Sequence, residues 1–107
     1  MDLSQRQHLL DVGGGTGAFL AEVGKAHPRL TLSLFDMPAV LAGVPSALRD
    51  RLALHPGSFR TDPLPKGADT ISLIRVLYDH DDPSVATLLA KVHATLPPGG
   101  MVLISEP

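Results

Sequence analysis

The sequence predicts one α/β domain built on a doubly wound parallel sheet. Short apolar runs alternate with segments whose apolar residues recur at helical spacing. The runs are apolar on both faces, which is typical of parallel strands covered by helices on each side. A glycine-rich turn follows the first run directly, at a position where sheets of this kind bind ligands. With 107 residues the chain has room for one such domain, spanning residues 1–107.

Five strands are expected, because five short apolar runs are each bounded by turn residues. Right-handed crossovers between parallel strands favour the doubly wound arrangement, and ligands then bind beyond the carboxyl ends of the strands. The expected strands cover residues 8–12, 30–35, 51–55, 70–77 and 101–107.

Three segments between these runs have helical spacing. Residues 17–27 and 38–49 are the first two, and a glycine and a proline interrupt the second. The third is expected to begin at Asp82 as the N-cap, because Pro83 suits the first helical position. Its apolar stripe consists of Val85, Leu88, Leu89, Val92 and Leu96.

Composition excludes several classes of protein. The formal charge is −2 and the Lys and Arg residues are scattered singly, which argues against a nucleic-acid or anionic-membrane surface. The chain has no cysteine, so it has no disulfide and no thiolate metal site. The first eight residues, MDLSQRQH, are mostly polar, and no apolar run approaches the roughly 20 residues that span a bilayer. We therefore expect a cytoplasmic protein without a transmembrane segment.

The glycine turn and an acid further along the chain favour a nucleoside-containing ligand. Gly13, Gly15 and Gly17 lie between the first strand and the first helix. Asp36 closes the second strand, where an acid can accept hydrogen bonds from ribose hydroxyls. Asp11 would repel a pyrophosphate but suits an ammonium or sulfonium group. Equally, Asp11 can hold the glycine turn through hydrogen bonds to backbone N–H groups.

Four blocks of the sequence occur in an order and spacing seen in a known enzyme family: LLDVGGGTGAFL, FDMPAV, GSFRTDPLPKGADTISLIRVLYDHDD and LPPGGMVLISEP. Through them the chain resembles, over essentially its whole length, the S-adenosylmethionine-dependent O-methyltransferases of the acetylserotonin/caffeate type. Within that family, RVLYDHDD resembles the bacterial hydroxyneurosporene (1-hydroxycarotenoid) O-methyltransferases. The resemblance implies a Rossmann-like core with strand order 3-2-1-4-5. It also implies methyl transfer from S-adenosylmethionine to a hydroxyl, with a hydroxylated small molecule, a carotenoid, as the acceptor.

The resemblance also implies which residues bind S-adenosylmethionine. Gly13 and Gly15 would approach the methionine moiety, and Asp36 would bind the ribose. Family members have Gly-Asp-Phe or Gly-Asp-Met where this chain has Gly57-Ser58-Phe59, so Ser58 would accept one hydrogen bond from the adenine amine without a charge. Met37 and Phe59 would pack against the adenine, and Arg75 matches a basic position before the catalytic loop. The implied set is Asp11, Gly13, Gly15, Asp36, Met37, Gly57, Ser58, Phe59 and Arg75.

The catalytic position departs from the family pattern. Related enzymes that methylate phenols read Leu-His-Asp-Trp, with the His as general base, where this chain reads Leu77-Tyr78-Asp79-His80. A Tyr with an ordinary pKa near 10 is a poor base and a fair hydrogen-bond donor, which is easier to reconcile with an aliphatic alcohol as acceptor. Asp79 or His80 could serve as the base, or could cap and solvate the loop. Consecutive acidic residues rarely converge on one ion, so no metal is expected.

Two alternatives remain open from the sequence. One is an NAD-type dinucleotide-binding domain, against which Asp11 and the LPPGG block weigh. The other is a non-catalytic cofactor-binding fragment. The family's members carry an N-terminal helical domain for dimerisation and substrate binding, and C-terminal antiparallel strands, and these are missing here. A homodimer is implied for full-length relatives, and the isolated chain is expected to be inactive because nothing would hold the acceptor.

Overall fold

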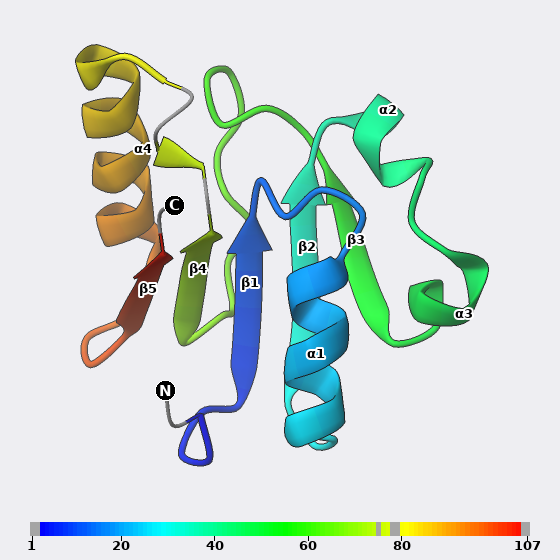
Figure 1. The fold of residues 1–107 in the computed structure, drawn as a ribbon. Helices are drawn as coiled ribbons and strands as arrows, with labels where there is room; N and C mark the ends of the chain where they lie inside the picture. Colours follow the sequence, from blue (N-terminus) through cyan, green and yellow to red (C-terminus); the bar gives the residue numbers. More distant parts are fainter. Residues whose placement is uncertain (1–2, 75, 78–79, 106–107) are drawn as a thin grey trace.

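The computed structural model describes residues 3–74, 76–77 and 80–105. Its centre is a five-stranded sheet in the order β3-β2-β1-β4-β5 (Figure 1). All four pairs of neighbouring strands are parallel, so the expected doubly wound sheet and its strand order are confirmed. The strands are β1 (His8–Val12), β2 (Thr31–Asp36), β3 (Leu52–Pro56), β4 (Thr70–Ile74) and β5 (Met101–Ser105).

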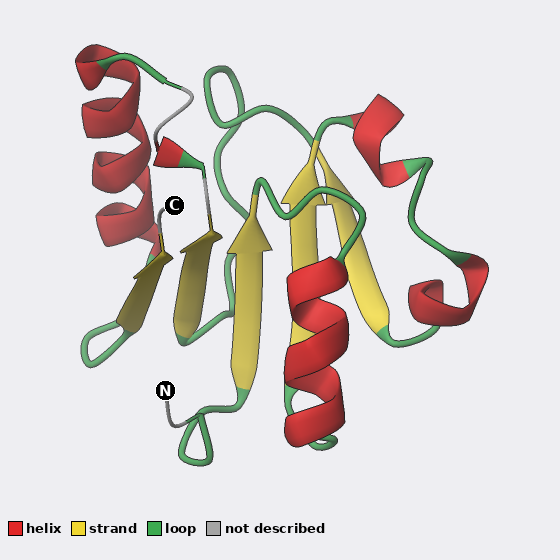
Figure 2. Cartoon of the chain, in the orientation of Figure 1, coloured by secondary structure: helices red, strands yellow, loops and turns green. Residues whose placement is uncertain are grey.

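Helices cover both faces of the sheet. The described helices are α1 (Ala18–Ala26), α2 (Pro38–Leu41), α3 (Ser46–Arg49) and α4 (Asp82–Thr95). In Figure 2, α1 lies across the middle of the sheet, α4 lies at the side of β4 and β5, and the short α2 and α3 lie beyond β3. No helix in the described ranges is long and apolar enough to cross a membrane.

Alternate residues of β1 and β2 pack into two separate apolar cores, one on each face of the sheet. Leu9 of β1 belongs to a core that contains Leu20 of α1. The next residue, Leu10, belongs to the opposite core, which contains Leu88 and Val92 of α4. Successive side chains of a strand point to opposite faces, so α1 and α4 lie on opposite sides of the sheet. This explains why β1 and β2 are apolar on both faces.

Several boundaries differ from the expectations. Residues 38–49 form two short helices, α2 and α3, separated at the expected glycine and proline. The fourth strand ends at Ile74, and Val76 and Leu77 are no longer extended strand. The fifth strand is described only to residue 105.

The expected N-cap of the last helix is wrong by one residue. Asp81, not Asp82, has the extended backbone of a cap, and its side chain accepts a hydrogen bond from the backbone N–H of Ser84 at 3.0 Å. A cap side chain accepts from an N–H two or three residues ahead, and Asp81 satisfies this geometry. Asp82 is therefore the first helical residue and Pro83 the second.

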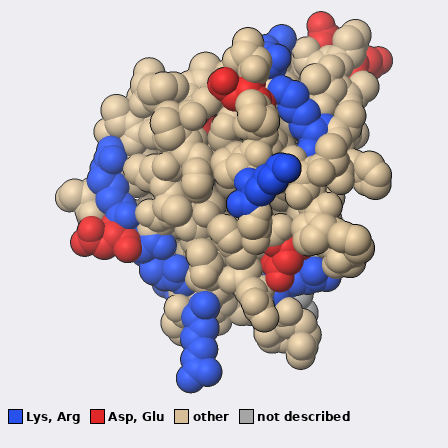
Figure 3. Space-filling model, turned by 180° about the vertical axis from the view of Figure 1, so that it is seen from behind, with Lys and Arg blue, Asp and Glu red and all other residues tan. Residues whose placement is uncertain are grey.

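Charged side chains are dispersed over the surface. On the face shown in Figure 3, the Lys and Arg side chains are spread over the surface, and several of them lie beside acidic side chains. The ion pair identified in the described ranges joins Lys25 and Glu22 of α1, with 3.6 Å between the charged atoms. Surface pairs of this kind contribute little, about 0–1 kcal/mol, so packing rather than charge holds this fold together.

Candidate functional site

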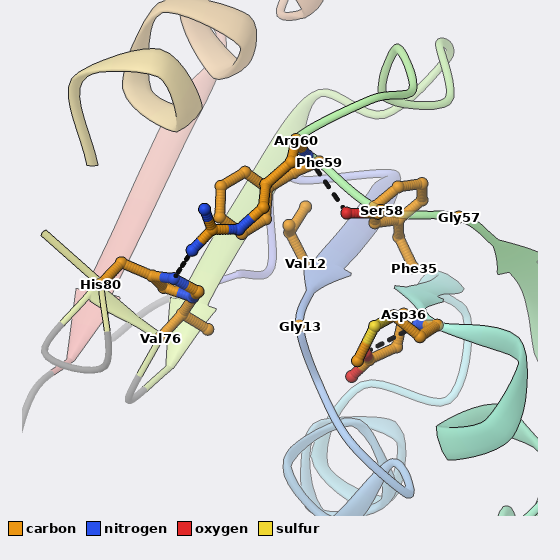
Figure 4. A pocket seen from close by; sticks show the side chains of 11 residues that line it. Val12, Gly13, Phe35, Asp36, Gly57, Ser58, Phe59, Arg60, Val76 and His80 are labelled. Carbon is orange, nitrogen blue, oxygen red and sulfur yellow. Dashed lines mark hydrogen bonds between the residues drawn. The ribbon is translucent and has the colours of Figure 1, made fainter. Parts of the chain in front are cut away.

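A cavity of about 280 Å³ opens at the carboxyl ends of the central strands (Figure 4). Its lining comes from the ends of β1 and β2 and from the segments that follow β3 and β4. This is the edge at which doubly wound sheets bind ligands. The lining residues are Val12, Gly13, Phe35, Asp36, Met37, Gly57, Ser58, Phe59, Arg60, Val76 and His80.

The backbone conformation and the packing of the turn between β1 and α1 require glycine. Gly13 and Gly15 have φ angles of 71° and 65°, a left-handed conformation that is costly for other residues. Gly14 has no room for a side chain, since a Cβ atom there would lie 2.3 Å from Oδ2 of Asp11 and 2.4 Å from Leu34. The bare turn therefore follows from local geometry as well as from any ligand.

Asp36 joins the glycine turn to the end of β2. Its Oδ2 accepts a hydrogen bond from the Gly15 N–H at 2.9 Å, and its Oδ1 accepts from the Met37 N–H at 2.7 Å. Each carboxylate oxygen has a second lone pair, so the group can still accept hydrogen bonds from a ligand. In Figure 4 Asp36 lies beside Gly13 at the edge of the cavity. The structure thus brings together the two sequence signals for a nucleoside.

Asp11 lies beneath the turn and does not line the cavity. Its side chain is fully buried, and its Oδ1 accepts a hydrogen bond from the Ser72 hydroxyl at 2.8 Å. Its Oδ2 has no hydrogen-bond partner among the described residues. Burial raises the pKa of Asp11 to about 7, the Ser72 hydroxyl lowers it, and the charge of Asp36 raises it. Asp11 supports the turn from below through packing, without the hydrogen bonds to backbone N–H groups that were one expectation.

Residues 57–62 form the wall of the cavity after β3, and we call them the pocket loop. The Gly57 N–H donates to the Asp36 carbonyl at 3.0 Å, which ties the start of the loop to β2. The Ser58 N–H donates to the Asp62 carboxylate at 2.8 Å, and the Asp62 N–H donates back to the Ser58 carbonyl, also at 2.8 Å. These bonds close the loop on itself. Gly57 is bare because a Cβ there would lie 2.8 Å from the ring of Phe35.

Arg60 and His80 close the cavity on the side of β4. The Arg60 guanidinium lies 3.0 Å from Nδ1 of His80 (Figure 4). The ring of Phe59 meets His80 edge to face, with 5.0 Å between ring centroids, and Arg60 lies 5.7 Å from the Phe59 centroid. A guanidinium can only donate, so Nδ1 accepts and the neutral His80 ring carries its proton on Nε2. In this arrangement His80 is a hydrogen-bond acceptor at Nδ1, and Nδ1 could take a proton only after Arg60 moves away.

The predicted site residues fall into three groups. Those that line the cavity are Gly13, Asp36, Met37, Gly57, Ser58 and Phe59. Asp11 and Gly15 belong to the glycine turn and its support without lining the cavity. Arg75, Tyr78 and Asp79 lie outside the described residues.

Sequence reasoning did not assign Val12, Phe35, Arg60, Val76 and His80 to the pocket wall. Val12 and Phe35 could have been inferred as the last residues of buried strands. Arg60 directly follows a predicted adenine-contacting block, and that position was a usable signal. The contact of Arg60 with His80 had no signal, because 20 residues separate the two.

The fold and the pocket define a doubly wound α/β domain with a cavity at the carboxyl ends of its strands. The O-methyltransferase domain model matches residues 1–107, and the chain belongs to this family. It is 58% identical over 106 residues to the demethylspheroidene O-methyltransferase of Rhodobacter capsulatus, covering 99% of this chain and 27% of that protein. It is 52% identical to the enzyme of the same name from Cereibacter sphaeroides, covering 99% of this chain and 29% of that protein. The chain therefore spans less than a third of the length of these relatives.

Solved structures agree with this assignment. Human N-acetylserotonin methyltransferase in complex with S-adenosylmethionine (SAM) superposes with a TM-score of 0.88 at 34% identity, over 97% of this chain and 30% of that one. The mitomycin 7-O-methyltransferase MmcR superposes with a TM-score of 0.91 at 31% identity, over 97% of this chain and 32% of that one. The resemblance inferred from the four sequence blocks is confirmed, and the NAD-type alternative receives no support from these similarities.

Proposed function

We propose that this chain is the S-adenosylmethionine-binding core of an enzyme that methylates a hydroxyl oxygen. The observation that carries the proposal is the cavity at the strand ends, where the Asp36 carboxylate faces the walls formed by the glycine turn and the pocket loop. Membership of the O-methyltransferase family supports it. Two of the similar solved structures hold S-adenosylmethionine, and two hold S-adenosylhomocysteine.

The residues of the cavity suit the nucleoside part of this cofactor. The carboxylate of Asp36 can accept hydrogen bonds from two ribose hydroxyls, which are donors. Phe59 and Met37 offer apolar surface to a flat base, and Ser58 offers a hydroxyl that can accept from an amine. Gly13 would leave the backbone open to the amino-acid part. In this proposal Arg75, which matches a cofactor-contacting basic position of the family, contacts the cofactor.

Methyl transfer depends more on alignment of the acceptor oxygen with the methyl group than on activation of either group. When bound, the cofactor supplies a methyl group on a positively charged sulfur, which an oxygen can displace in line. The protein's residues then have to hold the acceptor oxygen in position and exclude water, and alignment alone can be worth about 7–11 kcal/mol of barrier. Tyr78, in the position of the family's histidine base, would orient the acceptor hydroxyl, and Asp79 is the neighbouring candidate to take its proton.

We propose a hydroxycarotenoid as the acceptor. Two relatives are named for demethylspheroidene, at 58% and 52% identity. A tyrosine in place of a histidine base fits an alcohol that is not a phenol. Changing Tyr78 to Phe in a longer protein that contains this chain should leave most of kcat intact. A loss of several orders of magnitude with unchanged cofactor affinity would contradict the orienting role.

Calorimetric titration of the chain with S-adenosylhomocysteine tests the proposed cofactor. Measurable binding is expected, and Asp36→Ala should weaken it by about 1–3 kcal/mol, the scale for charge-assisted hydrogen bonds. Asp50→Ala, which removes an exposed carboxylate between α3 and β3, is the matched control and should bind like the unmodified chain. Equal affinity of the Asp36 variant would refute the ribose role, and tighter binding of NADH would refute the proposed cofactor.

A further inference from the structure

A lysine far from the cavity in sequence holds the pocket loop. Lys91 lies in α4, and its half-buried side chain reaches across to residues 57–62. Its Nζ donates hydrogen bonds to the carbonyl oxygens of Phe59 and Asp62, the second at 2.9 Å. One ammonium therefore binds two carbonyls of a loop that precedes it by about 30 residues.

The pocket loop depends on such contacts for its shape. It contains no helix or strand, and its part from Arg60 to Asp62 is exposed. Its start is fixed to β2 through Gly57, and its own hydrogen bonds close it between Ser58 and Asp62. Neither set of bonds joins the closed loop to α4. The two bonds from Lys91 do, and they add to the packing of Phe59 against the core that contains Leu88 and Val92 of α4.

The hydrogen bonds to the pocket loop are the interactions found for the Lys91 ammonium within the described ranges. No ion pair with a carboxylate is found for it within the described ranges, whereas Lys25 on α1 pairs with Glu22. A half-buried ammonium without a carboxylate must satisfy its N–H groups on other acceptors, and bonds from a charged donor are roughly twice as strong as neutral ones. The carbonyls of Phe59 and Asp62 serve as these acceptors. The Phe59 carbonyl bonds to Lys91 of α4, whereas the Phe59 side chain lines the cavity.

We propose that Lys91 is a positioning residue of the cofactor site. It sets the position of Ser58 and Phe59 without touching the ligand, and so contributes to affinity at the adenine side. The inference rests on the proposed function for its ligand. Its structural part, that Lys91 orders the pocket loop, can be tested without any ligand.

The test compares Lys91→Met, which keeps the length of the side chain and removes its donors, with Lys91→Arg, which keeps donors. Lys25→Met makes the same change on the exposed face of α1 and serves as the control. S-adenosylhomocysteine and adenosine are titrated into each variant well below its melting temperature. We expect Lys91→Met to raise the Kd of both ligands about 5- to 30-fold, because both carry the adenine. Lys91→Arg should return within about threefold of the original Kd, and Lys25→Met should not change it.

Amide hydrogen exchange of the ligand-free chains supplies the second measurement. Exchange at Thr61 and Asp62 should accelerate in Lys91→Met and stay slow in Lys25→Met, since the N–H groups of both residues bond to the Ser58 carbonyl. Unchanged exchange, or an unchanged Kd in a folded Lys91→Met chain, would overturn the proposal. So would an equal loss of affinity in Lys91→Arg. If Lys91→Met does not fold, Lys91→Gln replaces it. A chain that binds neither ligand, yet shows faster exchange in Lys91→Met, would refute the proposed function while leaving the role of Lys91 in the loop intact.

Discussion

Replacing Asp11 by Asn should remove a pH dependence from the stability of this chain. Asp11 is fully buried beneath the glycine turn, and only its Oδ1 has a hydrogen-bond partner among the described residues. Burial is the largest cause that raises its pKa, to about 7 from an ordinary value of 3.8. Asn has nearly the same shape, keeps an oxygen for the Ser72 hydroxyl, and carries no charge at any pH.

The direction in which stability changes with pH follows from whether the folded or the unfolded chain binds the Asp11 proton more tightly. The folded chain holds the Asp11 proton up to a pH of about 7, whereas the unfolded chain loses it near 3.8. The contribution to stability is therefore complete below about pH 4 and is lost as the pH rises to about 7. The difference between the two pKa values corresponds to about 4 kcal/mol, an upper bound because a buried site can relax. Above neutral pH the folded chain contains an ionised carboxylate without full hydrogen bonding.

Urea unfolding followed by circular dichroism between pH 4.5 and 8.5 measures this effect. The free energy of unfolding of Asp11→Asn minus that of the unmodified chain should rise by several kcal/mol across this range. His55, whose pKa is lowered by burial and by His8, is present in both chains, so its titration cancels in the difference. Asp50→Asn makes the same change on an exposed residue and should run parallel to the unmodified chain. A parallel profile for Asp11→Asn would refute the reasoning that Asp11 is protonated in the folded chain.

Three further predictions concern local structure. Gly14→Ala should destabilise the chain by about 3 kcal/mol or more in urea unfolding, because its Cβ would lie 2.3 Å from Asp11, whereas Gly15→Ala meets open space and should cost only about 1–2 kcal/mol of left-handed strain. Asp81→Ala should lower the unfolding free energy by about 1 kcal/mol through loss of the cap, and Asp82→Ala should cost less; the reverse order would contradict the assigned cap. The edge strand β5 exposes 52% of Ile104, which predicts that this chain self-associates through that edge; Ile104→Lys should then reduce the association measured by light scattering, and unchanged association would contradict this prediction.

The elements of this fold could be predicted because their signals are local. Each strand is a short run with its own boundaries, and β1 was predicted at residues 8–12, the bounds that the structure has. Strand order is not a local property, and it was reached through the family resemblance. The N-cap was missed because Asp81 and Asp82 stand side by side before a proline. Either can cap a helix, and only the backbone angles distinguish them.

The residues of the site also differ in whether the sequence could predict them, according to whether their signals are local or distant. Gly13 and Asp36 could be predicted because a turn and a strand end mark them within a few residues. The contact of Arg60 with His80 and the role of Lys91 could not, because they depend on how two loops and a helix meet. Lys91 in particular resembles any polar residue on a helix surface, and its contact with the pocket loop appears only once α4 is placed on the sheet.

The register of the sheet explains why these distant parts meet in one cavity. Asp36 is paired with Pro56 across β2 and β3, so the next residue, Gly57, presents its N–H to the Asp36 carbonyl at 3.0 Å. The same Asp36 accepts the Gly15 N–H through its side chain at 2.9 Å. One residue at a strand end thus fixes both the glycine turn and the start of the pocket loop, while Lys91 fixes the other side of that loop. A shift of β3 by one residue would turn every side chain of that strand to the other face and separate Gly57 from Asp36. The walls of the cavity are therefore set by the pairing of β2 with β3 before a ligand arrives, which reduces the ordering that binding has to supply.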